Sequence, residues 1–355
     1  MSVKGFFSKW YNRHLANPEA IALLLFMAVI GLILYSLGSI LLPLIIALVM
    51  AYLLEWPVGW FTEYKIPRLL SVLIVFTVFI GMVVLIVVGV VPVLKQQLSS
   101  LLNSLPDMFT EGKKLLKAIQ QEYPSIFNDN QLVEIVDSIK TFGTTAGRYI
   151  LSFSIASISN ILTIIVYLIL VPILVFLLLK DKDILINQAD YFMPEESSLI
   201  YKVMEEVHIG MGNYIRGKFL EAFIVGFFTY LVLVYYNLQY NALLSVLVGL
   251  SVFFPYVGAI ISTVPIALVG LFQMGLGYYF IELMTVYTII QIIDGYILVP
   301  VLLSDALRMN SIVIILSIIL FGGLFGFWGV VFAIPIAILI KAIINLWPSQ
   351  SHYAS

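Results

Sequence analysis

The sequence predicts an all-α membrane protein with about eight transmembrane helices, some of them broken or re-entrant in the C-terminal half. Three observations support this class. Hydrophobic residues form 62% of the 355 residues and charged residues only 11%, whereas a soluble domain carries about 25% charge. Several apolar stretches reach the length of about 20 residues that a helix needs to cross about 30 Å of hydrocarbon. The charged residues gather in two segments, 95–150 and 180–218.

Eight apolar stretches meet the length criterion. They cover residues 19–36, 39–56, 69–93, 153–179, 219–238, 242–272, 276–302 and 311–345. The link Ser36–Ser39 between the first two is short enough to predict a tight hairpin. The sixth and eighth stretches exceed the required length and contain internal Pro and Gly, so each is expected to be one broken helix or a re-entrant pair.

The spans and the hydrophilic segments together suggest a division of the chain. The expected regions are a three-span N-terminal region (1–94), an extramembrane domain (95–152), a fourth span (153–179), a cytoplasmic amphipathic segment (180–218) and a C-terminal transport core of four spans (219–347). Segment 95–150 carries six Lys and Arg against six Asp and Glu. Its leucines recur at helical spacing, which predicts amphipathic helices with turns at Pro106 and Pro124.

Lys and Arg in the short loops favour a cytoplasmic position for both termini. With the N-terminus inside, the cytoplasmic segments hold eleven Lys and Arg, and the short outer loops hold only Arg308. Segment 95–150 adds six outside, but it is near the length at which such residues lose influence. We therefore expect a multi-pass protein of the bacterial inner membrane.

Composition argues against several classes of function. The chain has no Cys, so it has no disulfide, thiolate nucleophile or thiolate metal site. Its three histidines show no ligand spacing, and a net charge of −2 offers no basic excess to a nucleic acid. No Gly-x4-Gly-Lys-Ser/Thr loop is present, so any transport must be passive or driven by a gradient. We expect neither an enzyme nor a cofactor.

A polar cluster lies inside the seventh stretch. Tyr287, Gln291 and Asp294 are spaced by four and three residues and share one helix face. Pro300 follows and leaves a backbone carbonyl free nearby. A carboxylate near the bilayer centre costs about 2.5–3.5 kcal/mol. The cluster therefore binds a cation, a proton or a polar solute, or else it is a buried hydrogen-bonded clasp between helices. Glu282, nearer the end of this stretch, is expected to be interfacial.

Two further patterns are candidates for function. Before the fifth stretch, Arg216-Gly217-Lys218 and Glu221 form either a gate at the cytoplasmic mouth or an ordinary positive anchor, and Lys218 can pair with Glu221. Gly and Pro also interrupt the sixth and eighth stretches with a similar rhythm. These positions are Pro255, Tyr256, Gly258 and Pro265 in one, and Gly322, Gly323, Gly326, Gly329 and Pro335 in the other. Such breaks offer backbone groups to a solute in secondary transporters, or they serve close helix packing.

These residues resemble the autoinducer-2 exporter family, also known as PerM-like permeases. The matching motifs, in order, are Tyr214-Ile215-Arg216-Gly217, Phe254-Pro255-Tyr256-Val257-Gly258, Gln291-x2-Asp294-x5-Pro300, Phe321-Gly322-Gly323-Leu324-Phe325-Gly326-Phe327-Trp328-Gly329 and Ala333-Ile334-Pro335. They cover roughly 200–345, while the N-terminal half matches only in layout. The resemblance implies an inner-membrane transporter that forms a homo-oligomer. Family members are described as exporters of autoinducer-2 or as sodium or lithium/proton antiporters.

Two positions depart from the family pattern. The family usually has Gln where this chain has Lys218, and it often has Glu-Asn where this chain has Asp294-Gly295.

We expect a secondary transporter or exporter of a small polar, autoinducer-2-like solute, with sodium ions or protons as coupling ions. The alternatives are a monovalent cation/proton antiporter and a non-transporting membrane scaffold.

Overall fold

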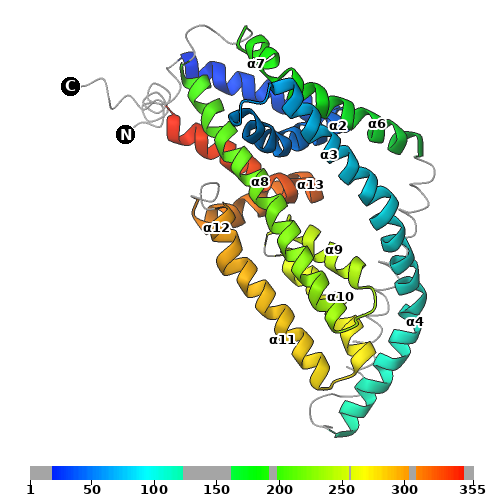
Figure 1. The fold of residues 1–355 in the computed structure, drawn as a ribbon. Coiled ribbons are helices and arrows are strands. Elements are labelled where there is room, and N and C mark those ends of the chain that lie inside the picture. The colour runs from blue at the N-terminus through cyan, green and yellow to red at the C-terminus, as the bar shows by residue number, and fades with distance from the viewer. Residues whose placement is uncertain (1–17, 123–160, 192–197, 256, 304–308, 348–355) are drawn as a thin grey trace, which may run out of the picture. The chain divides into compact units, whose positions relative to one another are not determined.

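The structure is a computed structural model that describes residues 18–122, 161–191, 198–255, 257–303 and 309–347. In these ranges the chain forms helices joined by short turns, and no strand occurs there, which confirms the all-α class (Figure 1). The helices are α2 (Pro18–Glu63), α3 (Arg68–Leu85), η1 (Ile86–Val90), α4 (Val91–Glu122), α6 (Ile161–Lys180), α7 (Lys182–Tyr191), α8 (Ser198–Tyr235), α9 (Asn241–Ser251), α10 (Val257–Met274), α11 (Tyr278–Ile293), η2 (Asp294–Leu298), α12 (Val299–Leu303) and α13 (Ser311–Leu346).

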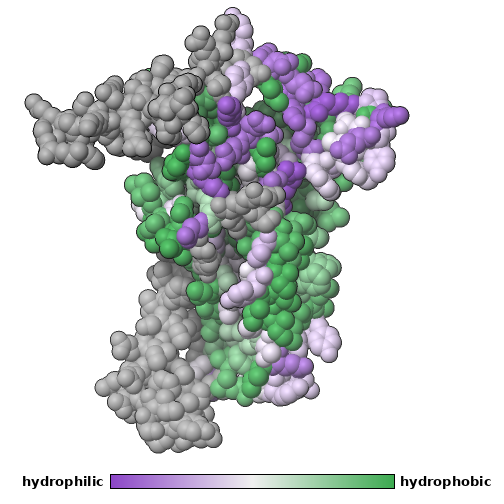
Figure 2. Space-filling view, turned by 90° about the vertical axis from the view of Figure 1, so that its left-hand side faces the viewer, coloured by the Kyte–Doolittle hydropathy of each residue, from purple (hydrophilic) through white to green (hydrophobic). Residues whose placement is uncertain are grey.

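Six helical segments are long and apolar enough to cross a membrane. They are Ile40–Glu63, Arg68–Gly112, Leu199–Tyr235, Val257–Met274, Tyr278–Leu303 and Ile312–Leu346, and the shorter apolar helices are Ile165–Lys180 and Asn241–Ser251. Many of their large apolar side chains are exposed, and Figure 2 shows hydrophobic areas, in green, on the middle and lower part of the face it presents. A polytopic membrane protein is therefore confirmed.

Two turns that the sequence predicts are absent. The hairpin expected at Ser36–Ser39 is wrong, because α2 runs without interruption from Pro18 to Glu63. One Gly between apolar turns costs a helix only about 1 kcal/mol, so Gly38 did not require a break. Pro106 lies inside α4 and makes no turn. Pro124 lies outside the described residues.

Two five-residue π-helices each end two residues before a proline. η1 precedes Pro92, and η2 precedes Pro300. At η2 the N–H of Val299 donates to the carbonyl of Asp294, five residues earlier, and an equivalent bond closes η1. Proline has no N–H and its ring clashes with the carbonyl four residues before it, so a wider turn accommodates it. Asp294 therefore begins an irregular turn whose position the sequence marks through Pro300.

The chain divides into two compact units, which we describe separately. Unit 1 comprises Met1–Val78, Ile169–Phe219 and Pro300–Ser355, and unit 2 comprises Phe79–Leu168 and Leu220–Val299. In unit 2, one core cluster is formed by Val225, Leu233, Leu238, Leu244, Val248, Val252, Ile266, Val269, Leu283 and Tyr287. In unit 1, Leu199, Ile200 and Val203 of α8 pack against Ala342 of α13.

Candidate functional site

The sixth apolar stretch is broken into two helices that form a hairpin. It forms α9 and α10, which pack against each other in unit 2. The loops at the outer ends of this hairpin meet, because the Gln239 N–H donates to Gln273 Oε1 at 2.8 Å and Gln273 Nε2 donates to the Asn237 carbonyl at 2.7 Å. The chain thus enters and leaves the hairpin at the same end of unit 2.

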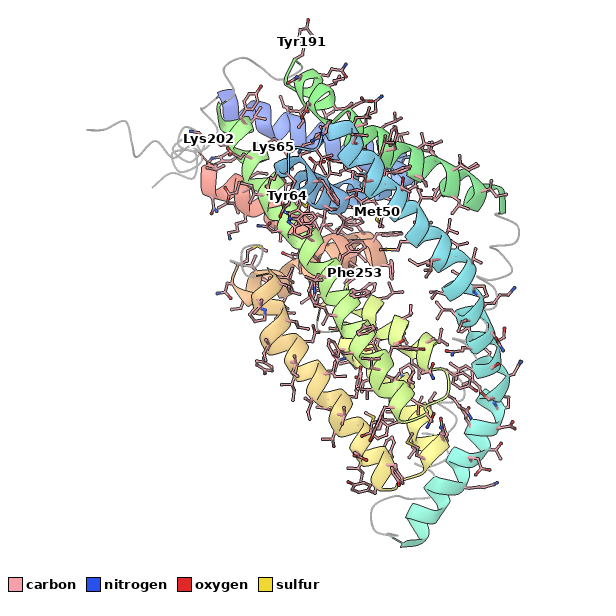
Figure 3. The ribbon with its side chains drawn as sticks, viewed as in Figure 1. Met50, Tyr64, Lys65, Tyr191, Lys202 and Phe253 are labelled. Carbon is pink, nitrogen blue, oxygen red and sulfur yellow. The ribbon has the colours of Figure 1, made fainter. Side chains whose placement is uncertain are left out.

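The turn between α9 and α10 contains the predicted Gly/Pro break. Phe253, labelled in Figure 3, lies in this turn, and the carbonyl of Pro255 accepts a hydrogen bond from Val257 at 2.7 Å. Tyr256 lies outside the described residues. A Cβ on Gly258 would lie 1.8 Å from the Ser251 carbonyl oxygen. Because no side chain fits there, Gly258 allows the start of α10 to contact the end of α9.

Four hydroxyl groups meet beside this contact. The Tyr287 hydroxyl from α11 lies 3.3 Å from Ser262 Oγ and 3.3 Å from Thr263 Oγ1 of α10. Ser262 Oγ lies 3.3 Å from Ser251 Oγ, at the end of α9. The side chains of Ser251, Ser262 and Tyr287 are buried. We name Ser251, Ser262, Thr263 and Tyr287 the hydroxyl cluster; it joins three helices through groups that can both donate and accept.

The predicted polar face of α11 follows on from this cluster. Tyr287 is buried, while Gln291 and Asp294 are half-buried. Asp294 is the first residue of η2, and its Oδ1 atom is shielded from solvent. Pro300 is exposed. The structure thus unites Tyr287 with the Gly258 hairpin and places Asp294 two helical turns further along α11, where the helix widens.

The eighth apolar stretch is also a hairpin, and it lies in unit 1. Gly326 has φ 60° and ψ −137°, a conformation that favours glycine, and the helix reverses there. A Cβ on Gly329 would lie 1.8 Å from the carbonyl oxygen of Phe321, and one on Gly322 would lie 2.9 Å from Val330 Cγ2. A Cβ on Gly323 would meet nothing within 4 Å. Pro335 lies in the second limb.

The two breaks are alike in detail. In each, one glycine after the turn touches a backbone carbonyl seven or eight residues earlier, at a distance that excludes any Cβ. We name these contacts, at Gly258 and at Gly329, the glycine closures. The broken-helix prediction is confirmed for both stretches, and the similar Gly/Pro rhythm reflects a similar local geometry.

The Arg-Gly-Lys segment is part of α8. Gly217 packs against α12, because a Cβ there would lie 2.7 Å from the Leu302 carbonyl oxygen. Arg216 folds along its own helix and donates to the Gly212 carbonyl at 3.0 Å and to Asn213 Oδ1 at 3.1 Å. Lys218 and Glu221 are only 4% and 1% exposed, so they are not a solvated anchor. Thr229, two turns beyond Glu221 on the same face, is fully buried as well.

Sequence reasoning missed how α4 contacts the hairpin. One face of α4 packs on α9, α10 and their loops, through Gln97, Leu101, Ser104, Met108 and Gly112. Gln97 Oε1 accepts from the Leu243 N–H at 2.8 Å, and Ser104 Oγ lies 2.8 Å from the Tyr240 hydroxyl. Tyr240 precedes α9 and offers its N-terminus no side-chain cap, so Gln97 caps α9 from another helix. The sequence shows that these residues of α4 recur every three or four positions, but it does not show which helices they contact.

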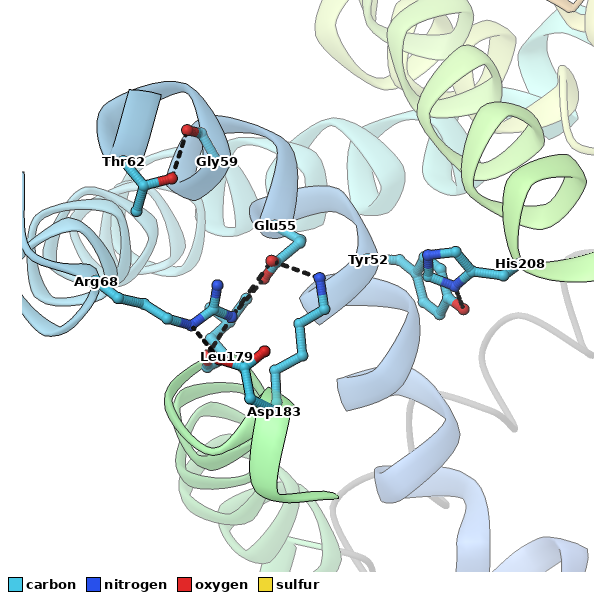
Figure 4. Close-up of polar contacts among 9 residues, drawn as sticks. Tyr52, Glu55, Gly59, Thr62, Arg68, Leu179, Asp183 and His208 are labelled. Carbon is cyan, nitrogen blue, oxygen red and sulfur yellow. Dashed lines mark hydrogen bonds and ion pairs between the residues drawn. The ribbon is translucent and has the colours of Figure 1, made fainter. Parts of the chain in front are cut away.

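Sequence reasoning also missed a charged network in unit 1 (Figure 4). Arg68 donates to both carboxylate oxygens of Glu55 at 3.3 Å and to the Leu179 carbonyl at 3.0 Å, at the end of α6. Lys182 Nζ donates to Glu55 Oε1 at 2.8 Å, and Asp183 lies 3.9 Å from Arg68 Nε. The network joins α2, α3, α6 and α7.

A second polar contact in unit 1 joins α2 to α8. The Tyr52 hydroxyl lies 2.6 Å from His208 Nδ1 (Figure 4).

No group of three or more His, Cys, Asp or Glu residues could hold a metal ion within the part of the chain that the structure describes.

Comparison with known proteins identifies the family. The family described as "AI-2E family transporter" matches residues 23–349. PerM of Escherichia coli (strain K12), named as a permease, is 41% identical over 340 residues, 96% of each chain. YrrI and YueF of Bacillus subtilis (strain 168), named as transport proteins, are 28% identical over 309 residues (85% of each chain) and 27% identical over 305 residues (84% of this chain and 82% of YueF). This multi-pass membrane protein therefore belongs to the AI-2E transporter family.

Proposed function

We propose that this protein is a secondary transporter or exporter of a small polar solute, with an autoinducer-2-like molecule as the first candidate. The glycine closures carry the proposal. Irregular backbone at membrane depth is tolerated where it is buried in protein or lines a water-filled cavity, and secondary transporters bind solutes at such breaks. Two breaks with the same closure, in a chain of a transporter family, favour a role in transport over packing alone.

The hydroxyl cluster is the proposed solute contact in unit 2. Its groups are uncharged, and each can donate and accept a hydrogen bond, which suits a small solute bearing hydroxyl or carbonyl groups. The three hydrogen bonds within the cluster are each 3.3 Å long and therefore weak. A solute oxygen could replace them at little cost in free energy. Pro255, in the turn beside it, is proposed to border the same route, and Tyr256 stays a candidate from the sequence alone.

Asp294 is the proposed coupling group. Asp294 is half-buried in an apolar helix, and ionisable residues within membrane spans usually mark an ion or proton path. Protonation, or exchange of a proton for sodium, would then be linked to solute movement. Gln291 lies between Asp294 and the hydroxyl cluster on the same helix face and would carry this link.

A flux assay in proteoliposomes tests the proposal. The purified chain is reconstituted, and a panel of radiolabelled polar solutes is followed with and without sodium and proton gradients. We expect Ser262→Ala and Tyr287→Phe to raise the KM for the transported solute severalfold, since each removes one hydroxyl. Thr288→Val is the matched control, because Thr288 is exposed and bonds only to Met284 in its own helix. Equal KM values in all variants would contradict the assignment.

A monovalent cation/proton antiporter is the second candidate function. The buried carboxylate of Glu221 on α8, together with Asp294 at the start of η2, favours it, since intramembrane carboxylates commonly mark ion paths. In sealed vesicles, a pH-sensitive dye would then report proton movement when sodium or lithium is added without any solute. Asp294→Asn is expected to abolish that signal. If no solute or ion moves in either assay, the scaffold alternative is the correct one.

A further inference from the structure

The turn that leads into α9 is held in a strained conformation. Asn237 and Tyr240 have φ values of 49° and 59°, in the left-handed region that residues other than glycine rarely adopt. For a residue as bulky as tyrosine this conformation is unfavourable, and it persists only where the surrounding structure fixes it. The turn from Asn237 to Tyr240 therefore needs contacts from other elements to keep its shape, and these contacts also fix the start of α9.

Helix α4 supplies such contacts to both limbs of the hairpin. The Tyr240 hydroxyl lies 2.8 Å from Ser104 Oγ, and Gln97 Oε1 accepts a hydrogen bond of 2.8 Å from the backbone in the first turn of α9. α4 also reaches the last turn of α10, because a Cβ on Gly112 would lie 3.1 Å from Phe272 Cε1. One face of α4 thus holds α9 and α10 together at their base.

The connection of α4 to the rest of unit 2 allows it to move. Ser104 and Tyr240 are half-buried, so water can replace the bond between them at a small net cost. The chain enters α4 through η1, which has no buried residue, and a Cβ on its Gly89 would meet nothing within 4 Å. Helices bend at such π-turns. Leu101 and Met108 of α4 pack against the core of unit 2, which makes the seated position the resting one.

The hairpin can carry a movement at its base to the hydroxyl cluster. The Gly258 closure brings the start of α10 against the end of α9, so the two limbs move together. Beside this closure, Ser262 and Thr263 contact α11 through the Tyr287 hydroxyl, at 3.3 Å each. Hydrogen bonds of this length are weak. A hairpin that is free at its base would lose these contacts to α11 first.

We propose that α4 is a regulatory clamp on the α9/α10 hairpin. When α4 is seated, it keeps the turn before α9 strained and the hydroxyl cluster closed against Tyr287. When α4 swings about η1, the turn relaxes and the hairpin leaves Tyr287, which opens the cluster to a solute. The purpose of the clamp rests on the proposed transport function, whereas its effect on the hairpin does not.

Hydrogen exchange of the purified full chain, measured by mass spectrometry, tests the effect on the hairpin. Ser104→Ala and Tyr240→Phe each remove one partner of the same bond, so each should speed exchange in residues 257–263 roughly two- to fivefold. The double variant should show no further increase, because the same single bond is lost in all three proteins. Ser99→Ala, at an exposed position of α4, is the matched control and should leave this exchange unchanged.

A reversible cross-link tests the purpose of the clamp in a chain that has no native Cys. Ser104→Cys/Tyr240→Cys, bridged by a short bifunctional methanethiosulfonate, fixes α4 on the hairpin. Solute flux in proteoliposomes should then fall about tenfold and return when the bridge is reduced. Ser100→Cys/Ser104→Cys is the control, because its bridge stays within α4 and should leave flux intact.

The two readouts separate the clamp from the transport function. The clamp is overturned if Ser104→Ala and Tyr240→Phe leave exchange in residues 257–263 unchanged, or if the bridged protein moves solute at the full rate. If exchange responds as expected but neither the wild type nor any variant moves a solute, the clamp stands and the proposed transport function fails.

Discussion

At the scale of single residues, the two glycine closures place the tightest constraints on this chain. A side chain at Gly258 or at Gly329 would meet a backbone carbonyl oxygen at 1.8 Å, and a backbone atom cannot rotate out of the way as a side chain can. Most other helical glycines in the described residues have more space, and several have no neighbour within 4 Å. A Cβ on Gly217 or Gly249 would also lie close to a backbone carbonyl oxygen, at 2.7 and 2.8 Å, but the tightest contacts are at the two helix breaks.

Alanine at either closure should separate the limbs of its hairpin. We expect Gly258→Ala and Gly329→Ala each to lower the free energy of unfolding by at least about 2 kcal/mol, because the backbone must shift to admit the methyl group. Thermal unfolding in detergent, followed by tryptophan fluorescence, would measure this. Gly81→Ala in α3 is the control, since its Cβ would have open space. Equal unfolding temperatures in all three variants would contradict the closures.

Residue-level prediction from sequence succeeded where the chemistry is local. Gly and Pro in an apolar stretch signal a break because Gly gives the backbone extra freedom and Pro removes a helical hydrogen bond, whatever surrounds them. Ser251, Ser262 and Thr263 gave no such signal, since a hydroxyl in a transmembrane helix usually bonds within its own helix. Their link to Tyr287 depends on how three helices pack, which spacing along one helix cannot reveal.

At the scale of elements, the packing of α4 is what the sequence did not reveal. The extramembrane domain expected from residue 95 stays a prediction. In the structure, one face of α4 from Gln97 to Gly112 packs on α9, α10 and their loops. Leu243, the partner of Gln97, lies 146 residues away in sequence, so periodicity within one helix cannot identify it.

Removing the Gln97 cap should loosen α9. Gln97→Leu leaves the Leu243 N–H without its acceptor, at a cost of about 1 kcal/mol in local stability. Hydrogen exchange measured by mass spectrometry should then show faster exchange in residues 241–251. Gln96→Leu is the matched control, because the exposed neighbour Gln96 should leave the exchange of α9 unchanged. Unchanged exchange in both variants would mean that α9 does not depend on α4.

At the scale of the whole molecule, the hairpins change the expected path of the chain through the membrane. The loops before α9 and after α10 meet through Gln239 and Gln273, so we propose that the chain enters and leaves this hairpin on one side of the bilayer. In unit 1, Gly217, at the end of the segment that the sequence places in the cytoplasm, contacts Leu302 of α12. Arg308 lies outside the described residues.

Labelling of single cysteines should confirm this path, since the chain has no native Cys. Gln239→Cys and Leu276→Cys are both at exposed positions in the loops that flank the hairpin. In intact cells, a membrane-impermeant maleimide should label both, because both loops lie on one side. If one position is labelled and the other is labelled only after permeabilisation, then α9 and α10 cross the membrane and the re-entrant path is wrong.

The whole account depends on water reaching the hydroxyl cluster, and one cysteine tests this most directly. Ser262→Cys is nearly isosteric and is fully buried in the structure, and Ser245→Cys, in α9 and 4% exposed, is its dry control where α8 and α9 pack closely. The measurement is the rate at which a small, charged methanethiosulfonate reagent modifies each thiol in reconstituted vesicles. We expect Ser262→Cys to react, more slowly when a transported solute is present, while Ser245→Cys stays inert. A transport-competent Ser262→Cys protein that never reacts would contradict a solute route beside the Gly258 closure.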